Sequence, residues 1–228
     1  AGRLAQDLGA GTLIGPDDHC SPSLVIVSTP PDVADICVVD ALIRYPEAVV
    51  SDVASVKLAV LEGVVEEAEH RGLDITSRYV GSHPMAGRER SGAGAADADL
   101  FYGRPWVIVP SPTSSPDAVM RIRSLAGDVG AFPIEMDAST HDQSVALISH
   151  VPQLISSMLA ARLADAPVSA LSLSGQGLRD TTRIAASDPR LWTAILAGNA
   201  GPVVKVLKDI RGDLDDLISH LDAAAQEG

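Results

Sequence analysis

The stretch LVIVST at residues 24–29 decides the fold class, because it is a continuous run of apolar and β-branched side chains. Such a run is typical of a strand buried on both faces, as in a parallel sheet. AVVSDVAS (48–55) and WVIVP (106–110) repeat the pattern, and a helical segment, DVADICVVDALIRYP (32–46), separates the first two runs. Strands that alternate with helices predict an α/β domain with a mostly parallel sheet.

A second helix of this domain is expected at KLAVLEGVVEEAEHRG (57–72), where Leu58, Leu61, Val64, Val65 and Ala68 mark one face. Gly72 follows this helix, and we expect its backbone to adopt the left-handed conformation that commonly ends a helix. Residues 116–130 predict another helix, and AFPIEM (131–136) predicts a short strand.

The pattern changes from Asp137 onward. Residues 139–166 predict a long, mostly apolar helix with a kink at Pro152, and Asp188 with Pro189 predicts a capped helix start. No strand-like run follows residue 136. The last helix carries an apolar heptad seam, which suits packing against a neighbouring helix of this chain or of another: Val203, Leu207, Ile210, Leu214, Leu217 and Leu221. We therefore expect two domains, residues 1–136 and 137–228.

Composition argues against several classes of protein. A net charge of −13 disfavours nucleic acid and anionic membrane surfaces as partners. Cys20 and Cys37 have no metal-type spacing and suggest a reducing compartment. No apolar run reaches the length of a membrane span, and residues 1–11 do not have the pattern of a signal peptide. We expect a soluble, cytoplasmic protein.

Polar groups that could do chemistry follow the predicted strands. Ligands of open parallel sheets bind beyond the carboxyl ends of the strands, which here are residues 28–31, 51–57 and 81–84. His83 can take up a proton near neutral pH, and Ser55 could orient the same substrate hydroxyl. A catalytic His83 and a His83 that only caps a loop both remain open at this point.

The helical half carries a second polar group, GQGLRDTTRIAASDPRLW (175–192). An arginine here could clamp a carboxylate, and Arg183, among Thr, Ile and Ala, is our choice. The alternative for Arg179 and Asp180 is an ion-pair network that caps helices. His141 and His150 lie nine residues apart, which argues against a metal site, so we expect His141 and Asp142 to make supporting hydrogen bonds.

Together these motifs resemble one family. GSHPMAG (81–87), HDQSVALISHVP (141–152) and GLRDTTRIAASDPRLW (177–192) look like the prephenate and arogenate dehydrogenases of tyrosine biosynthesis, and VSTPP (27–31) and SDVASVK (51–57) are similar to that family's cofactor domain. The resemblance implies a partial Rossmann-type domain that binds NAD or NADP. It also implies an all-α domain that binds prephenate or arogenate and forms a homodimer.

The resemblance also implies residue roles. His83 would accept the proton of the substrate hydroxyl, and Ser55 would form hydrogen bonds with that hydroxyl and with His83. Arg183 would bind the substrate carboxylate. The remaining implied contacts are Gln153, Trp192, Gly175 and Arg179 for substrate, and Ser28, Thr29, Pro30, Pro31, Asp52, Ser55 and Met85 for cofactor.

The sequence departs from the family pattern in two places. No Gly-x-Gly-x-x-Gly turn follows any strand, so we expect the dinucleotide unit of about 30 residues to be missing. Gln153 stands where many prephenate-using members carry His, which leaves prephenate and arogenate open. Two other functions remain: a non-catalytic substrate-binding fragment, or another two-domain hydroxyacid dehydrogenase. The latter would need a lysine in the helical domain, and no lysine occurs between Lys57 and Lys205.

Overall fold

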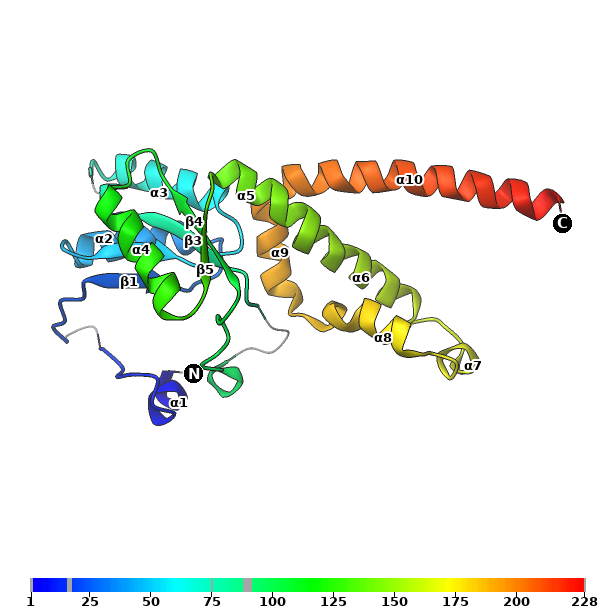
Figure 1. The fold of residues 1–228 in the computed structure, drawn as a ribbon, viewed down its shortest axis with the longest axis horizontal. Helices are drawn as coiled ribbons and strands as arrows, with labels where there is room; N and C mark the ends of the chain where they lie inside the picture. The colour runs from blue at the N-terminus through cyan, green and yellow to red at the C-terminus, as the bar shows by residue number, and fades with distance from the viewer. Residues whose placement is uncertain (1, 16–17, 75, 88–91, 228) are drawn as a thin grey trace.

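The computed structural model describes residues 2–15, 18–74, 76–87 and 92–227. A twisted sheet with helices on both faces forms the first half, and helices alone form the second (Figure 1). The strands are β1 (Leu24–Val27), β2 (Val49–Asp52), β3 (Val80–Pro84), β4 (Pro105–Pro110) and β5 (Phe132–Glu135). The α/β class is confirmed, and the described residues contain no strand after Glu135.

The sheet is parallel except at one pairing. β1 pairs with β2 in parallel, and a parallel bridge from Val50 to Tyr79 continues the sheet to β3. β4 pairs with β3 antiparallel, with His83 opposite Val107, and then pairs with β5 in parallel. The predicted mostly parallel sheet is therefore confirmed, with the β3–β4 pairing as an antiparallel exception that the sequence analysis did not foresee. A strand buried on both faces has the same apolar pattern in either direction, so composition could not fix its direction.

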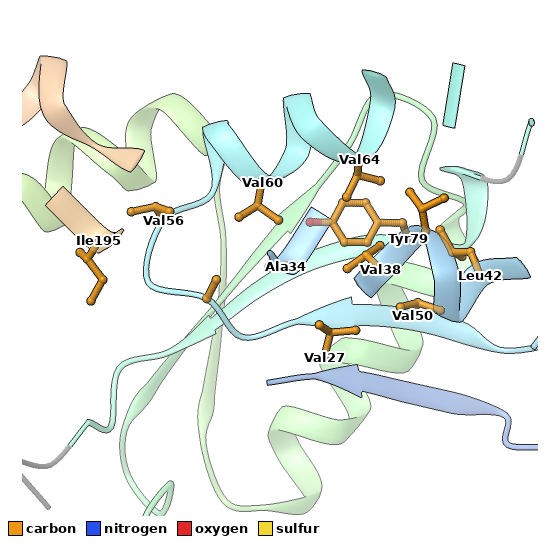
Figure 2. Packing of buried hydrophobic residues seen from close by; sticks show 12 residues of the cluster. Val27, Ala34, Val38, Leu42, Val50, Val56, Val60, Val64, Tyr79 and Ile195 are labelled. Atoms are coloured by element: carbon orange, nitrogen blue, oxygen red, sulfur yellow. The ribbon is translucent and has the colours of Figure 1, made fainter. Parts of the chain in front are cut away.

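Helices cover the sheet because each has one apolar face. α2 (Ala34–Arg44) and α3 (Leu58–His70) lie side by side on one face, and α4 (Pro116–Asp128) lies on the other (Figure 1). Figure 2 shows the core under α2 and α3, where Val38, Val60 and Val64 surround the Tyr79 ring. Gly72 ends α3 with a φ of 68°, as predicted. The short helices of this half are α1 (Gly2–Asp7), η1 (Thr76–Arg78) and η2 (Ala93–Ala95).

The long apolar helix of the second half is interrupted before Pro152 rather than kinked at it. α5 (Ala138–Val145) passes into a π-helical turn, η3 (Ala146–His150), and then into α6 (Val151–Arg162). Pro152 has no N–H for the carbonyl one turn earlier, so the distortion lies N-terminal to the proline. His150 is the last residue of this π-helical turn.

The remaining helices run from α6 to the C-terminus. They are α7 (Val168–Leu171), α8 (Gln176–Thr182), η4 (Arg183–Ala186), α9 (Pro189–Gly198) and α10 (Ala200–Glu227). Asp188 caps α9 as predicted, because its carboxylate accepts the N–H of Arg190. Val203 is buried, and Leu207 and Ile210 pack beside it against the π-helical turn and α6, whereas the rest of α10 projects away from the molecule (Figure 1).

Residues Ala138–Arg162 are long and apolar enough to cross a bilayer by length and composition. The same helix carries His141, Asp142 and His150, all buried against the rest of the protein. A helix that packs into a globular core passes the same length and composition test, and 33% of the apolar window is buried inside this protein.

The two halves share a packed contact. Ile195 of α9 belongs to the core of the sheet domain and lies near Val56, just before α3 (Figure 2). Gly198 approaches Val56 so closely that an added Cβ would lie 3.0 Å from its methyl group. The carboxyl ends of β1, β2 and β3 therefore face the helical domain.

Candidate active site

A cavity of about 490 Å³ lies where the carboxyl ends of β2 and β3 meet the helical half. Six of the predicted site residues line it: Ser55, His83, Met85, Gln153, Arg183 and Trp192. His83 comes from the end of β3, Gln153 from α6 and Arg183 from η4. The fold thus brings the imidazole of His83 and the guanidinium of Arg183 to one cavity, although they are 100 residues apart. A second cavity, of about 560 Å³, lies along α3 and contains none of these groups.

His83 is held by a chain of hydrogen bonds from α5. Its Nδ1 lies 2.9 Å from Nε2 of His141, and Nδ1 of His141 lies 2.7 Å from Oδ1 of Asp142. The Asp142 carboxylate can only accept, so Nδ1 of His141 carries a proton, and a singly protonated His141 offers Nε2 as an acceptor. His83 must then donate from Nδ1, which leaves its Nε2 unprotonated for the cavity. This is the tautomer that a general base requires.

The surroundings of His83 also keep it neutral. Burial lowers the pKa of His83 well below its usual value, and the positive charge of the nearby Lys57 lowers this pKa further. A His83 that is neutral at pH 7 can accept a proton.

Asp142 fixes this chain to the sheet domain. Its two carboxylate oxygens accept the backbone N–H groups of Lys57 and Leu58, both at 2.9 Å. These donors open α3, whose own N-cap residue makes no side-chain cap bond. The positive end of the α3 dipole therefore stabilises the carboxylate. The expectation that His141 and Asp142 make supporting hydrogen bonds is confirmed.

Asp52, predicted to contact cofactor, is part of the core. Its side chain is fully buried, pairs with the Nζ of Lys57, and accepts bonds from the Tyr79 hydroxyl and the Ala54 N–H. The carboxylate would have to lose these partners to reach a ligand, and its contact with cofactor stays a prediction. Burial is the main cause of the lowered pKa of Lys57 and of the raised pKa of Tyr79.

The other predicted residues lie outside the residues that line the cavity. Ser28, Thr29, Pro30 and Pro31 follow β1, at the same edge of the sheet. The hydroxyl of Thr29 is buried with no hydrogen-bond partner in the described part of the chain. Gly175 and Arg179 lie on the exposed surface at α8. The Asp180 carboxylate accepts a hydrogen bond from Nε2 of Gln176, and the described residues show no ion pair between Arg179 and Asp180, the alternative considered for them.

Sequence reasoning missed two residues at this site. His150 lines the cavity with its ring at 84° to that of Trp192, and the ring centroids lie 6.0 Å apart. Asn199, between α9 and α10, is buried and bonds both His150 and the backbone of Asp142. The sequence did contain a signal for Asn199, because it is a polar residue at the junction of two apolar helices. Among the residues that the structure describes, no group of three or more His, Cys, Asp or Glu side chains could hold a metal ion.

Comparison with known proteins identifies the family. The model of the prephenate dehydrogenase nucleotide-binding domain matches residues 5–135, and that of the prephenate dehydrogenase dimerization domain matches residues 137–228. The chain belongs to the prephenate dehydrogenase family. The "Probable prephenate dehydrogenase NovF" of Streptomyces niveus is 35% identical over 224 residues, which cover 98% of this chain and 60% of that protein.

Solved structures of the family share the fold. Prephenate dehydrogenase from A. aeolicus, in complex with hydroxyphenyl propionate and NAD+, superposes with a TM-score of 0.79 at 26% identity, covering 91% of this chain and 71% of that one. Synechocystis arogenate dehydrogenase superposes with a TM-score of 0.72 at 30% identity. The match covers 88% of this chain and 71% of that one. The family resemblance and the fold class are therefore confirmed. The chain spans 60% of the length of the Streptomyces relative.

Proposed function

We propose that this chain forms the substrate cavity of a nicotinamide-dependent dehydrogenase that oxidatively decarboxylates prephenate or arogenate. The observation that carries the proposal is the shared cavity of His83 and Arg183, with the acceptor nitrogen of His83 left for a ligand. Family membership supports the same reaction class.

The residues at the sheet edge fit the nicotinamide end of NAD or NADP. Ser55 and Met85 line the cavity, and the unpartnered hydroxyl of Thr29 follows β1 at the same edge. Ligands of open α/β sheets bind at this edge. We propose that these three residues hold the nicotinamide half, which supplies the hydride acceptor when it is bound. The choice between NAD and NADP stays open, since no ribose-reading residue has been assigned.

His83 would act on the ring hydroxyl. Its Nε2 takes the hydroxyl proton while the carbon that bears the hydroxyl loses a hydride. The ring carboxylate leaves as CO2, and its bonding electrons complete the aromatic ring. Aromatisation supplies the driving force, so the protein mainly positions the reactants and removes one proton. Arg183 would hold a substrate carboxylate through a charge-assisted pair.

Gln153 bears on the choice between the two substrates. Its Nε2 donates to the Ile184 carbonyl at 2.9 Å, which leaves Oε1 as the group available to the cavity. An acceptor oxygen suits the ammonium group of arogenate better than the keto group of prephenate. We propose that arogenate binds at least as well as prephenate.

A steady-state assay of the protein with prephenate and arogenate, each with NAD and NADP, tests this function. We expect saturable formation of NADH or NADPH with at least one pair. Cofactor binding without turnover of either substrate would contradict the proposed reaction. An absence of both cofactor binding and turnover would favour the non-catalytic fragment. A hydroxyacid dehydrogenase with a catalytic lysine in the helical domain is disfavoured because no lysine occurs between Lys57 and Lys205.

We also propose a homodimer through the helical half. The match to the family's dimerization domain supports it, as do the exposed apolar residues of α10, Leu214, Leu217, Ile218 and Leu221.

A further inference from the structure

Asn199 is a buried amide between α9 and α10, with 2% of its surface exposed. Its Nδ2 lies 2.8 Å from the backbone carbonyl oxygen of Asp142 and 3.0 Å from Nδ1 of His150. A carbonyl oxygen can only accept, so the atom that faces it must be the NH2 group. The orientation of the Asn199 amide is therefore fixed by the backbone of α5.

This orientation determines which nitrogen of His150 carries the proton. The NH2 group of Asn199 can only donate, so Nδ1 of His150 must accept and must be unprotonated. A neutral His150 then carries its proton on Nε2. The structure records no partner for Nε2 among the described residues, and His150 is one of the residues that line the cavity. His150 thus has an N–H available to a ligand.

The two cavity histidines are held in opposite states. Asp142 acts through His141 and makes Nε2 of His83 an acceptor, whereas Asn199 makes Nε2 of His150 a donor. We propose that Asn199 is a positioning residue that holds His150 as a hydrogen-bond donor to an acceptor oxygen of the bound substrate. The proposal rests on the proposed function for the identity of that substrate, but the protonation pattern is independent of it.

The Nε2–H group of His150 remains a hydrogen-bond donor at neutral pH. Burial, the largest cause, lowers the pKa of His150 to about 4, so the ring remains neutral at pH 7 and keeps a single proton. The His150 ring is bonded to Asn199 and packs nearly at a right angle to the Trp192 ring, so it cannot turn freely to exchange its two nitrogens. The cavity therefore presents two different groups to a substrate. Nε2 of His83 can accept a proton from one substrate oxygen, and Nε2 of His150 can donate a hydrogen bond to another.

Nitrogen-15 NMR of the histidine-labelled protein tests the pattern without any activity. We expect Nε2 of His150 to be protonated in the wild type. In Asn199→Asp, whose carboxylate can only accept at the same place, we expect the proton to move to Nδ1. A wild-type His150 protonated on Nδ1, or on both nitrogens at pH 7, would overturn the proposal.

Steady-state kinetics with prephenate or arogenate test the role. Asn199→Asp should raise the substrate KM roughly tenfold, the loss expected for one hydrogen bond in a desolvated site, with the cofactor KM unchanged. An unchanged substrate KM in a folded Asn199→Asp protein whose proton has moved would overturn the role.

A pair of variants at position 150 keeps the test valid if Asn199→Asp does not fold. Gln places an amide N–H where Nε2 stood, whereas Leu offers no donor. We expect His150→Leu to raise the substrate KM about tenfold and His150→Gln to recover part of that loss. Equal losses in the two variants would overturn the donor role. A wild type that binds cofactor but turns over neither substrate would refute the proposed function, while the NMR result would still decide the proton positions.

Discussion

At the scale of single residues, the site depends on which neighbour each imidazole has. His83 and His150 are both neutral because burial lowers their pKa values. Burial alone makes them equivalent, and only the hydrogen-bond partner of each Nδ1 makes one an acceptor and the other a donor. A histidine at a strand end could be predicted from the sequence to be reactive, but the tautomer depends on residues more than 45 positions away.

The first prediction at this scale concerns Arg183. Substitution of Arg183 by Ala should weaken substrate binding by about 2–4 kcal/mol, because the substrate carboxylate would lose its charged partner as it leaves water. The substrate KM in steady-state kinetics measures this effect. Arg190→Ala, which removes an exposed arginine outside the cavity lining, is the control. A near-wild-type KM for Arg183→Ala would place the carboxylate clamp elsewhere.

The second prediction concerns the pH dependence of stability. His150 has a folded pKa of about 4, below the usual 6.5, so the unfolded chain binds more protons between these values. The contribution of neutral His150 is therefore complete above pH 6.5 and is lost as the pH falls toward 4. Between pH 7 and pH 5, the wild type should lose about 2 kcal/mol more unfolding free energy than His150→Gln. Urea unfolding at the two pH values measures it, and equal losses would contradict the lowered pKa.

At the scale of elements, the least local feature is the start of α3. The first N–H groups of this helix are capped by Asp142, which lies 84 and 85 residues later in α5. The apolar periodicity of α3, its Gly72 end and the strands before it could all be predicted from local sequence. The cap could not, because nothing near Lys57 indicates that its partner belongs to another domain. The same limit hid Asn199.

Asp142→Asn tests this link between elements. The amide can accept with only one atom, so at least one buried N–H or the His141 ring loses its acceptor. We expect the free energy of unfolding to fall by about 2–4 kcal/mol. Chemical denaturation measures it, with Asp137→Asn as the control. Asp137 caps α5 on the surface, and Asn is an equally good cap. A loss no larger than in this control would show that Asp142 does not hold α3 to α5.

At the scale of the whole molecule, residues of both packed halves line the cavity. One helix, α10, extends beyond the two halves (Figure 1). The heptad seam predicted for the last helix serves two purposes. Its first half packs within the chain, whereas Leu214, Leu217 and Leu221 are each at least half exposed. The apolar periodicity of the sequence predicted which face of α10 packs against other helices. It could not show at which residue the packing within this chain ends.

Leu217→Glu tests the outer half of this seam. If α10 pairs with a second copy, a buried glutamate would lose its hydration without a partner and dissociate the dimer. Sedimentation velocity should show a dimer for the wild type and a monomer for Leu217→Glu. Ser219→Glu adds the same charge about 200° around the helix and should leave the dimer intact. A monomeric wild type, or a dimeric Leu217→Glu, would contradict the proposed assembly.

In the proposed reaction, His83 removes the substrate proton as hydride leaves. Single-turnover formation of NADH or NADPH by His83→Asn, with substrate and cofactor saturating, tests it most directly, with the exposed His70→Asn as control. We expect hydride transfer to slow at least 100-fold, the usual worth of a general base, while the substrate dissociation constant changes little. A single-turnover rate equal to that of the wild type would contradict the account.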